Sequence, residues 1–246
     1  MTAQLSQIWV YPIKAVGRQM LGSATLSPSA CIPGDRAWAV TREGANVDGS
    51  QWERCGNFIR AASAPMLQAV DITSEAADGT FTLTHPDQPD IKIDPAKDGD
   101  ALVDWLSPML PKGLQAAKLV QAQTQGMTDS AYPSITLCNF SSHRAVSQRL
   151  GQDLSIHRWR GNLWIDGLAP WEEFDWIGRE VQIGDCVLFV EDRTERCRST
   201  EANPETGRRD ADVLGALSSW DHADFSVLAK VLEGGSIQPG HKVAVL

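Results

Sequence analysis

The stretch that decides the fold runs Val187-Leu-Phe-Val-Glu-Asp-Arg-Thr-Glu-Arg-Cys-Arg-Ser-Thr-Glu-Ala-Asn-Pro-Glu-Thr-Gly207. Its apolar start predicts a buried strand, and Pro204 and Gly207 near its end predict a turn. Between them, Cys197 lies between two arginines. Nearby positive charge favours the thiolate, the form of cysteine that attacks electrophiles and binds soft metals. Because isolated cysteines are more often small buried hydrophobes, the sequence leaves both a reactive and a structural interpretation of Cys197 open.

The composition is that of a globular protein with a substantial core, since 42% of the 246 residues are hydrophobic and 22% are charged. The net charge of -9 argues against a general binder of nucleic acid or anionic membranes, which would use a basic face. No apolar run of about eighteen residues or more predicts a transmembrane helix, and the first residues lack the pattern of a secretion signal. We therefore expect a cytoplasmic protein that contacts neither nucleic acid nor membrane.

The cysteines also favour a reducing compartment. There are five of them, with no C-x-x-C pair, at Cys31, Cys55, Cys138, Cys186 and Cys197. An odd number without a dense framework is typical of free thiols. An attached ferredoxin module would need four closely spaced cysteines. Any electrons that the protein uses would therefore come from a separate protein.

The rest of the chain predicts many short strands and few helices. Strands are predicted at Leu5 to Ile13, Met20 to Leu26, Ala37 to Thr41, Met66 to Thr73, Phe81 to Thr84, Ile91 to Asp94, Leu114 to Ala122, Pro133 to Cys138, Asn162 to Asp166, Glu180 to Ile183, Cys186 to Val190, Thr194 to Ala202, Phe225 to Leu232 and Lys242 to Leu246. Helices are predicted at Leu102 to Leu110, at His143 to Leu150 with Ser141 or Ser142 as the N-cap, and near Val213 to Leu217, and a turn at Ala77 to Gly79. Many short strands joined by Gly and Pro turns favour a barrel over an open parallel sheet.

Several common chemistries lack their signatures. The chain has no G-x-x-x-x-G-K-[ST], no strand-linked G-x-G-x-x-G, no G-x-S-x-G and no H-E-x-x-H. A P-loop nucleotide triphosphatase, a Rossmann dehydrogenase, a lipase-type hydrolase and a zincin are therefore disfavoured. The five histidines are scattered, and we assign them no role.

Basic and amide residues next to predicted turns are the second candidate feature. Lys14 follows the first strand, Arg36 follows a Gly-Asp turn, and the segment 158–162 carries two arginines and Asn162. Guanidinium groups match phosphate bidentately and lysine adds a point charge, so these side chains could converge on one anion. Taken singly, each is more often a surface charge, whose ion pair contributes about 0 to 1 kcal/mol.

Five ordered elements of the chain resemble the MOSC family, the molybdenum cofactor sulfurase C-terminal domain, preceded by its N-terminal β-barrel partner. They are Tyr11-Pro-Ile-Lys-Ala-Val-Gly17, Gly34-Asp-Arg-Ala-Trp38, Arg158 to Gly167, Asp175 to Gly184 and Arg196 to Gly207. The resemblance implies a mainly β fold with a few short helices, in which a MOSC-type β-barrel packs against an N-terminal β-barrel-like domain. We place the boundary at Lys112-Gly113, which gives domains of residues 1–112 and 113–246.

The resemblance also implies a molybdopterin-type molybdenum cofactor. In the family the cysteine of the R-C element ligates molybdenum, which makes Cys197 the expected metal ligand and catalytic residue. The expected contacts to the phosphate and pterin are Lys14, Arg36, Arg160 and Asn162, with a further hydroxyl contact from Ser142.

The chain departs from the family pattern at four places. Ala15 replaces a serine, Gly161 replaces the proline of R-P-N, the region Val47 to Arg60 follows no family pattern, and His241 stands where the final turn often carries aspartate. The first two departures alter the expected cofactor site, and the third alters the expected substrate-facing wall.

The resemblance implies an oxidoreductase that reduces small N-hydroxylated compounds from N-OH to N-H with electrons from a flavin or iron-sulfur partner protein. Two alternatives stay open from the residues. One is a sulfur carrier that holds a persulfide on Cys197 for delivery to a metallocofactor, since a low-pKa thiolate suits that role equally well. The other is a module that binds the cofactor without turnover.

Overall fold

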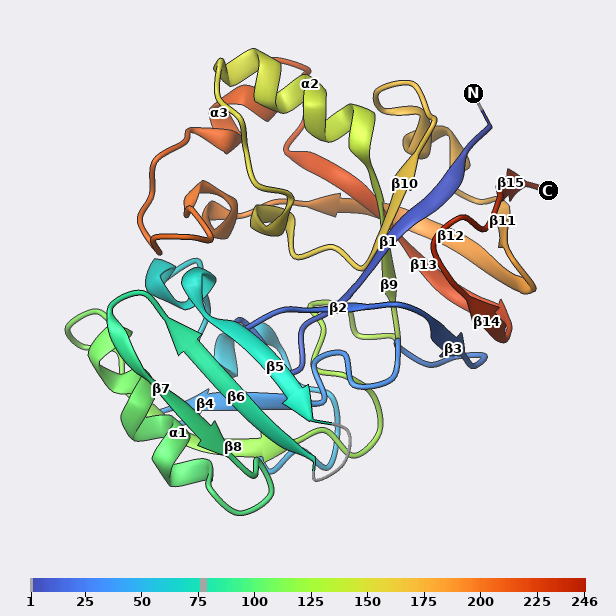
Figure 1. Cartoon of the computed structure of the whole chain (residues 1–246). Helices are drawn as coiled ribbons and strands as arrows, with labels where there is room; N and C mark the ends of the chain where they lie inside the picture. Colours follow the sequence, from blue (N-terminus) through green and yellow to red (C-terminus); the bar gives the residue numbers. More distant parts are fainter. Residues whose placement is uncertain (1, 76–78) are drawn as a thin grey trace.

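The computed structural model describes residues 2–75 and 79–246, and it is mainly β, as predicted. Figure 1 shows two bodies, one above the other. The upper body contains one large sheet with the helices α2 (Phe140–Leu150) and α3 (Val213–Ser218), and the lower one contains small sheets and α1 (Gly99–Leu106). Both chain ends lie at the upper body. Among the described residues, no helix is both long and apolar enough to cross a membrane.

The large sheet has eight strands in the order β15-β11-β12-β13-β9-β10-β1-β2. Their bounds are Val243–Val245, Glu180–Ile183, Cys186–Glu195, Asp224–Glu233, Ile135–Asn139, Leu163–Asp166, Gln4–Val10 and Gln19–Leu21. The pairing of β9 with β10 is parallel and the other pairings are antiparallel. Along β12 the buried residues alternate with less buried ones, because successive side chains of a strand point to opposite faces.

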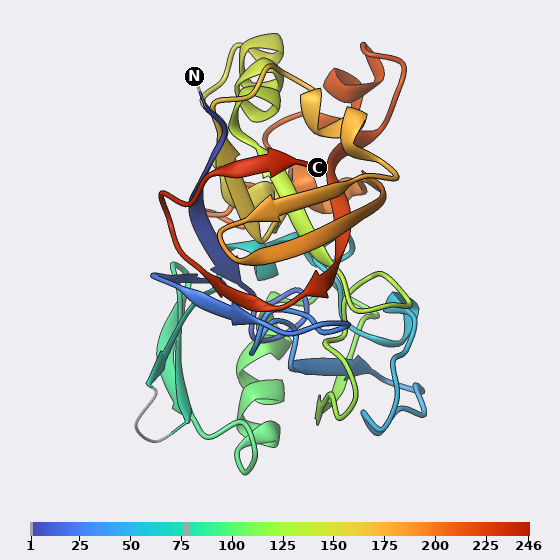
Figure 2. The same cartoon turned by 90° about the vertical axis from the view of Figure 1, so that its right-hand side faces the viewer.

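The two ends of this sheet approach each other, although the strand ladder does not close into a barrel. Figure 2 shows the red C-terminal segment passing beside the blue first strand. Here Leu5 N donates to His241 O, and Gly240 N donates to Leu5 O, both over 2.8 Å. The predicted barrel is therefore a curled sheet whose gap is spanned by these hydrogen bonds.

Small sheets and one helix form the lower body. β5 (Asp71–Glu75), β6 (Thr80–His85) and β7 (Gln88–Ile93) form one meander, and β4 (Trp38–Arg42) pairs with β8 (Ala116–Gln121). The helix α1 packs against β7 and β8 and buries Leu102 and Leu106 in the core of this body. A two-stranded sheet of β3 (Ala24–Leu26) and β14 (Gly235–Ile237) joins the N-terminal and C-terminal parts of the chain.

Several predicted elements differ in the structure. The strand predicted at Met66 to Thr73 begins only at Asp71, because the 3-10 helix η2 (Pro65–Ala69) precedes β5. The strand predicted at Thr194 to Ala202 is absent from the described structure, because β12 continues to Glu195 and the 3-10 helix η6 (Arg198–Glu201) follows. The N-cap of α2 is Asn139, whose side chain accepts from Ser141 N, rather than a serine. The strand β14 was not predicted. Ala77 and Asp78, predicted to lie in a turn, are outside the described residues.

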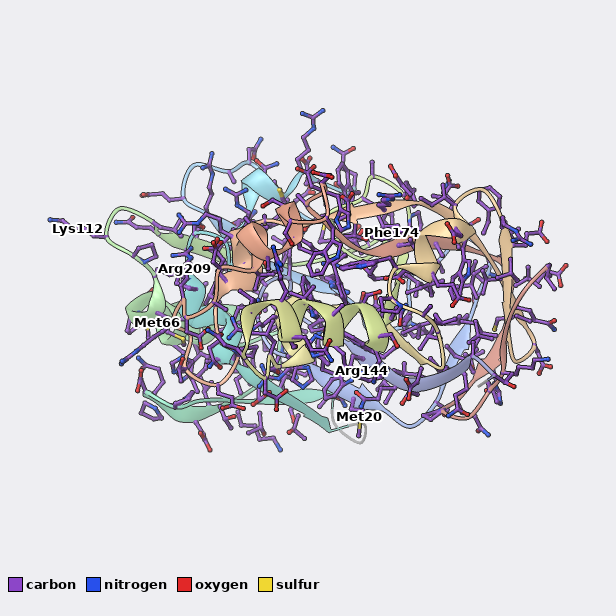
Figure 3. The ribbon with its side chains drawn as sticks, turned by 90° about the horizontal axis from the view of Figure 1, so that it is seen from above. Met20, Met66, Lys112, Arg144, Phe174 and Arg209 are labelled. Atoms are coloured by element: carbon purple, nitrogen blue, oxygen red, sulfur yellow. The ribbon has the colours of Figure 1, made fainter. Side chains whose placement is uncertain are left out.

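The two bodies share segments of the chain. The strand β1 is N-terminal in sequence and yet lies in the large sheet between β10 and β2. The strand β8 follows the predicted boundary and pairs with β4 of the lower body. In Figure 3, Lys112 projects from the loop between α1 and β8, at the outer edge of the molecule. The division at residues 112 and 113 stays a prediction.

Truncating the central strand of the large sheet should destabilise the protein. Leu137 on β9 is fully buried and pairs with Leu163 and Val227 on the two neighbouring strands. We expect Leu137→Ala to lower the free energy of unfolding by about 2 to 5 kcal/mol, because the lost methyl groups leave a cavity. Denaturant unfolding measures this. The control is Leu232→Ala, whose side chain on β13 is 45% exposed and should change stability by less than about 0.5 kcal/mol. Equal effects would contradict the described core.

Candidate functional site

A cavity of about 430 Å³ lies where residues from both parts of the chain meet. Five of the six predicted site residues line it, namely Lys14, Arg36, Arg160, Asn162 and Cys197. Six basic side chains line the cavity, whereas the carboxylates in its lining are those of Asp129 and Glu195. In a chain whose net charge is -9, this concentration of positive charge indicates a site for an anion.

Lys14 enters the cavity from the turn that follows the first strand. A bridge between Ile13 and Val16 closes this turn, and Ala15 has a φ of 64°. The Lys14 Nζ donates to Met127 O over 2.8 Å and to Asp129 Oδ1 over 2.5 Å. Burial lowers the pKa of Lys14, which is 6% exposed. The ammonium group is thus held in place from a loop that lies 113 residues further along the chain.

Arg36 and Arg160 lie against the ring of Tyr11. Their guanidinium carbons are 4.5 and 4.3 Å from the ring centroid. Arg36 is ion-paired with the buried carboxylate of Asp35, and its Nη2 donates to Arg160 O over 2.8 Å. Tyr11 donates its hydroxyl proton to Gly161 O, and burial raises its pKa. A rigid aromatic ring therefore fixes both guanidinium groups at the cavity.

The charge of Arg160 is incompletely compensated. Its Nη1 donates to Gly17 O over 3.2 Å, and its Nη2 is buried without a hydrogen-bond partner among the described residues. Burial, and then the charge of Arg36, lower the pKa of Arg160 to about 9. A buried cation without a counterion is costly, and an anion bound in the cavity would relieve that cost. This orphaned donor fits the phosphate of a bound cofactor.

Asn162 and Gly161 shape the wall of the cavity. The Asn162 side chain accepts from Thr136 N and donates to Trp9 O, both over 3.1 Å, and is 1% exposed. Its amide thus joins β1 and β9 on either side of its own strand. A Cβ atom on Gly161 would lie 2.0 Å from the Cys138 sulfur, so the proline expected from the family pattern does not fit here. A side chain at position 161 would therefore clash with the buried Cys138.

Cys197 follows the end of β12 and exposes its side chain at the cavity. Its sulfur lies 3.1 Å from the Ser199 hydroxyl. Arg196 also lines the cavity, and its guanidinium donates to Trp159 O over 2.9 Å and to Phe225 O. These hydrogen bonds anchor the arginine, while the neighbouring thiol stays exposed. An exposed thiol is a ligand for soft metals, and the basic side chains of the same cavity can bind an anion. Together they fit a cofactor that carries a metal and a phosphate.

Two buried polar side chains hold the loop that carries Cys197. Arg158 donates to Thr200 O and Glu201 O and pairs with Asp210. Gln68 donates to Ser199 O over 3.0 Å from the other part of the chain. Arg158 was a candidate for anion binding, and the structure uses it to hold this loop. In Figure 3, Arg209 of the same loop and Met66 lie at the same edge of the molecule, and Arg209 donates to Ala62 O over 2.6 Å.

Ser142 does not line the cavity. It is fully buried near the start of α2, where its hydroxyl donates to the Glu173 carboxylate over 2.8 Å and accepts from Trp171 N. Asn139 donates to the same carboxylate, and burial raises the pKa of Glu173. The Ser142 hydroxyl, which was expected to contact the cofactor, thus forms its hydrogen bonds inside the upper body.

Several residues of the site were not assigned from the sequence, and four polar ones illustrate why. Gln68, Asp129, Glu195 and Cys55 hold or line the cavity. Gln68 could have been found from the sequence, because it is a single amide side chain inside the apolar run that begins at Met66. The other three lie in polar segments, where sequence offers no sign of which side chains face a cavity.

Comparison with known proteins identifies related sequences. The MOSC N-terminal beta barrel domain matches residues 2–128, and the MOSC domain matches residues 127–244. A molybdenum cofactor sulfurase from Drosophila willistoni is 32% identical over 49% of this chain and 16% of its own length. Mitochondrial amidoxime-reducing component 1 from Mus musculus is 25% identical over 90% of this chain and 72% of its own. The crystal structure of the YUAD protein from Bacillus subtilis aligns over 100% of this chain and 96% of its own, at 10% identity and a TM-score of 0.46.

The buried imidazole of His143 should make the protein sensitive to acid. His143 Nδ1 accepts from Nε1 of Trp159, a cavity-lining residue, and burial lowers the pKa of His143 from 6.5 to about 4. The unfolded chain takes up a proton below pH 6.5 while the folded chain does not. Stability is therefore fully present above that pH and declines down to about pH 4, by up to about 3 kcal/mol.

Unfolding free energies measured between pH 7 and pH 4 test this. In His143→Gln the loss of stability over this range should be smaller than in the wild type. It should not vanish, because burial lowers the pKa of His157 to about 4 as well. An unchanged pH dependence in the variant would refute the role of His143.

Proposed function

The chain belongs to the MOSC family, with a MOSC N-terminal beta barrel domain ahead of its MOSC domain, and from that premise we propose that it is a molybdenum-cofactor oxidoreductase. Its substrates would be small compounds with an N-OH group, which it reduces to N-H. The observation that carries this proposal is the convergence of Cys197 with Lys14, Arg36 and Arg160 on one cavity. One relative is named for amidoxime reduction and another for the molybdenum cofactor, which agrees with the proposal.

The residues of the cavity suit the separate parts of such a cofactor. Lys14, Arg36 and Arg160 would bind its phosphate, and the unpartnered Nη2 of Arg160 would gain an acceptor. Asn162 would form part of the wall beside the pterin. Cys197 would be the protein ligand of the metal. When bound, the cofactor would supply the electron exchange, while the protein orients it and tunes its ligands.

The proposal includes a separate electron donor, a flavoprotein or an iron-sulfur protein. All five cysteines are free thiols, and Cys138 and Cys186 are buried, so the chain offers no cysteine cluster for an iron-sulfur centre of its own. Free thiols also support placing the protein in the reducing cytoplasm.

Replacing the proposed metal ligand should remove metal and leave pterin. We expect Cys197→Ser, made in a host that synthesises the cofactor, to lose most of its molybdenum, since a hydroxyl is a poorer ligand than a thiolate for a soft metal. Elemental analysis measures the metal, and fluorescence of the oxidised pterin measures the cofactor. The control Cys31→Ser changes a thiol outside the cavity lining and should keep both. Wild-type protein without molybdenum and pterin, from a host whose own molybdoenzymes are loaded, would refute the proposal.

Replacing the proposed phosphate ligand should remove the whole cofactor. We expect Arg160→Gln to retain about 10- to 100-fold less pterin under dilution, because hydrogen bonds to charged groups contribute about 1.5 to 3 kcal/mol. The control is Arg144→Gln, which removes an exposed guanidinium paired with Asp166 on the upper body. Equal pterin retention in the two variants would contradict a phosphate site at Arg160.

A sulfur carrier is the second candidate, and the exposure of the Cys197 thiol favours it. In that case Cys197 would carry one extra sulfur, visible by intact-protein mass spectrometry and absent from Cys197→Ser. Reduction of benzamidoxime to benzamidine by wild type with reduced methyl viologen would instead favour the oxidoreductase. Protein that holds molybdenum and pterin, carries no extra sulfur and shows no turnover would be a cofactor-binding module.

A further inference from the structure

The carboxylate of Glu195 is the feature of the cavity that cofactor binding leaves unexplained. It lines the cavity on the last residue of β12, two positions before Cys197. Glu195 and Cys197 are both exposed, whereas Arg196 between them lines the same cavity and is anchored through Trp159 O and Phe225 O. Residues two apart in an extended chain share a face. The carboxylate and the thiol therefore both face this cavity.

Glu195 has no ion-pair or hydrogen-bond partner for its side chain among residues 2–75 and 79–246. The other carboxylate in the cavity lining, Asp129, is bound to Lys14 over 2.5 Å. The buried Asp35 is paired with Arg36, which lines the cavity. Glu195 is thus the carboxylate of this cavity that is free to receive a ligand.

The neighbouring strand adds to this charge rather than neutralising it. Glu195 is in register with Asp224 of β13, and like charges directly opposite each other destabilise a sheet. Asp224 has Arg193 as a distant partner, 3.9 Å away, and the Arg193 guanidinium itself lies over the Phe174 ring at 4.2 Å. Among the described residues, Arg193 thus pairs with Asp224 and not with Glu195. A cation bound next to Glu195 would relieve this repulsion.

We propose that Glu195 selects N-hydroxylated substrates whose carbon also carries an amino group, such as amidoximes, by binding that amino group beside Cys197. This inference rests on the proposed reductase function. A carboxylate accepts an N-H bond from the amino group of an amidoxime, and two parallel N-H bonds from an amidinium cation in the way that it accepts them from arginine. Hydroxamic acids carry a carbonyl oxygen at the same position and would gain no such bond.

The attraction between Glu195 and the bound compound becomes stronger as the reaction proceeds. An amidoxime, R-C(NH2)=N-OH, takes up two electrons and two protons, breaks its N-O bond, and gives the amidine R-C(NH2)=NH and water. The electrons come from the reductant, and the amidine then takes up a further proton and becomes a cation. Because positive charge develops during the reaction, a fixed carboxylate stabilises later states more than the substrate, which raises the rate.

The test compares Glu195→Gln with the wild type in cofactor-loaded protein, using benzamidine as a cationic probe and benzamide as its neutral control. We expect Glu195→Gln to bind benzamidine about 1.5- to 5-fold more weakly by calorimetry, as for an exposed ion pair, with benzamide binding unchanged. Glu195→Asp should retain most of the preference for benzamidine. Glu180→Gln, an exposed carboxylate on β11, should match the wild type.

Turnover provides the second measurement. With reduced methyl viologen as the donor, Glu195→Gln should lower kcat/KM for benzamidoxime by a similar factor and leave that for benzohydroxamic acid unchanged. An unchanged benzamidine affinity, or an equal loss for both substrates, would overturn the role of Glu195. If the loaded wild type reduces neither compound, the reductase function fails, and the benzamidine titration still decides whether Glu195 binds an amidine.

Discussion

The site depends on one buried cation, the guanidinium of Arg158. It is 3% exposed and holds the loop after Cys197 through Thr200 O, Glu201 O and the carboxylate of Asp210. Removing one partner of a buried ion pair is costly, so this loop cannot move without exposing an unpaired charge. Gln68 adds a bond to Ser199 O from the other part of the chain. The position of the thiol is therefore coupled to the packing of the two bodies.

The cavity is a product of this packing, because neither part of the chain contains all its walls. Lys14 and Arg36 come from the N-terminal part, and Arg160 and Cys197 come from the C-terminal part. The ring of Tyr11 brings two guanidinium groups together where their charges repel each other. Such an arrangement lowers stability unless an anion binds, and groups kept in costly environments are typical of functional sites.

Most strands and helices could be predicted because they follow local rules. β11, Glu180–Ile183, alternates buried and exposed residues within two glycine turns, and α3 begins after Asp212, which caps it. The prediction failed at Thr194 to Ala202, where Thr200 bonds back to Cys197 O and forms a 3-10 turn held by Arg158. Long-range hydrogen bonds overrode the local preference there.

The sequence by itself determined the mainly β class, the family, and which basic residues and which thiol were candidates, because motif spacing and alternation are local properties of the chain. The tertiary structure decided which candidates meet. It brought Arg160 to the cavity, turned the neighbouring Arg158 into a structural cation, and buried Ser142 against Glu173. It also placed Glu195 at the same cavity as Cys197, with no partner for its carboxylate among the described residues. The reason is that side-chain direction and ion pairing depend on distant segments, whose contacts form only when the sheets pack.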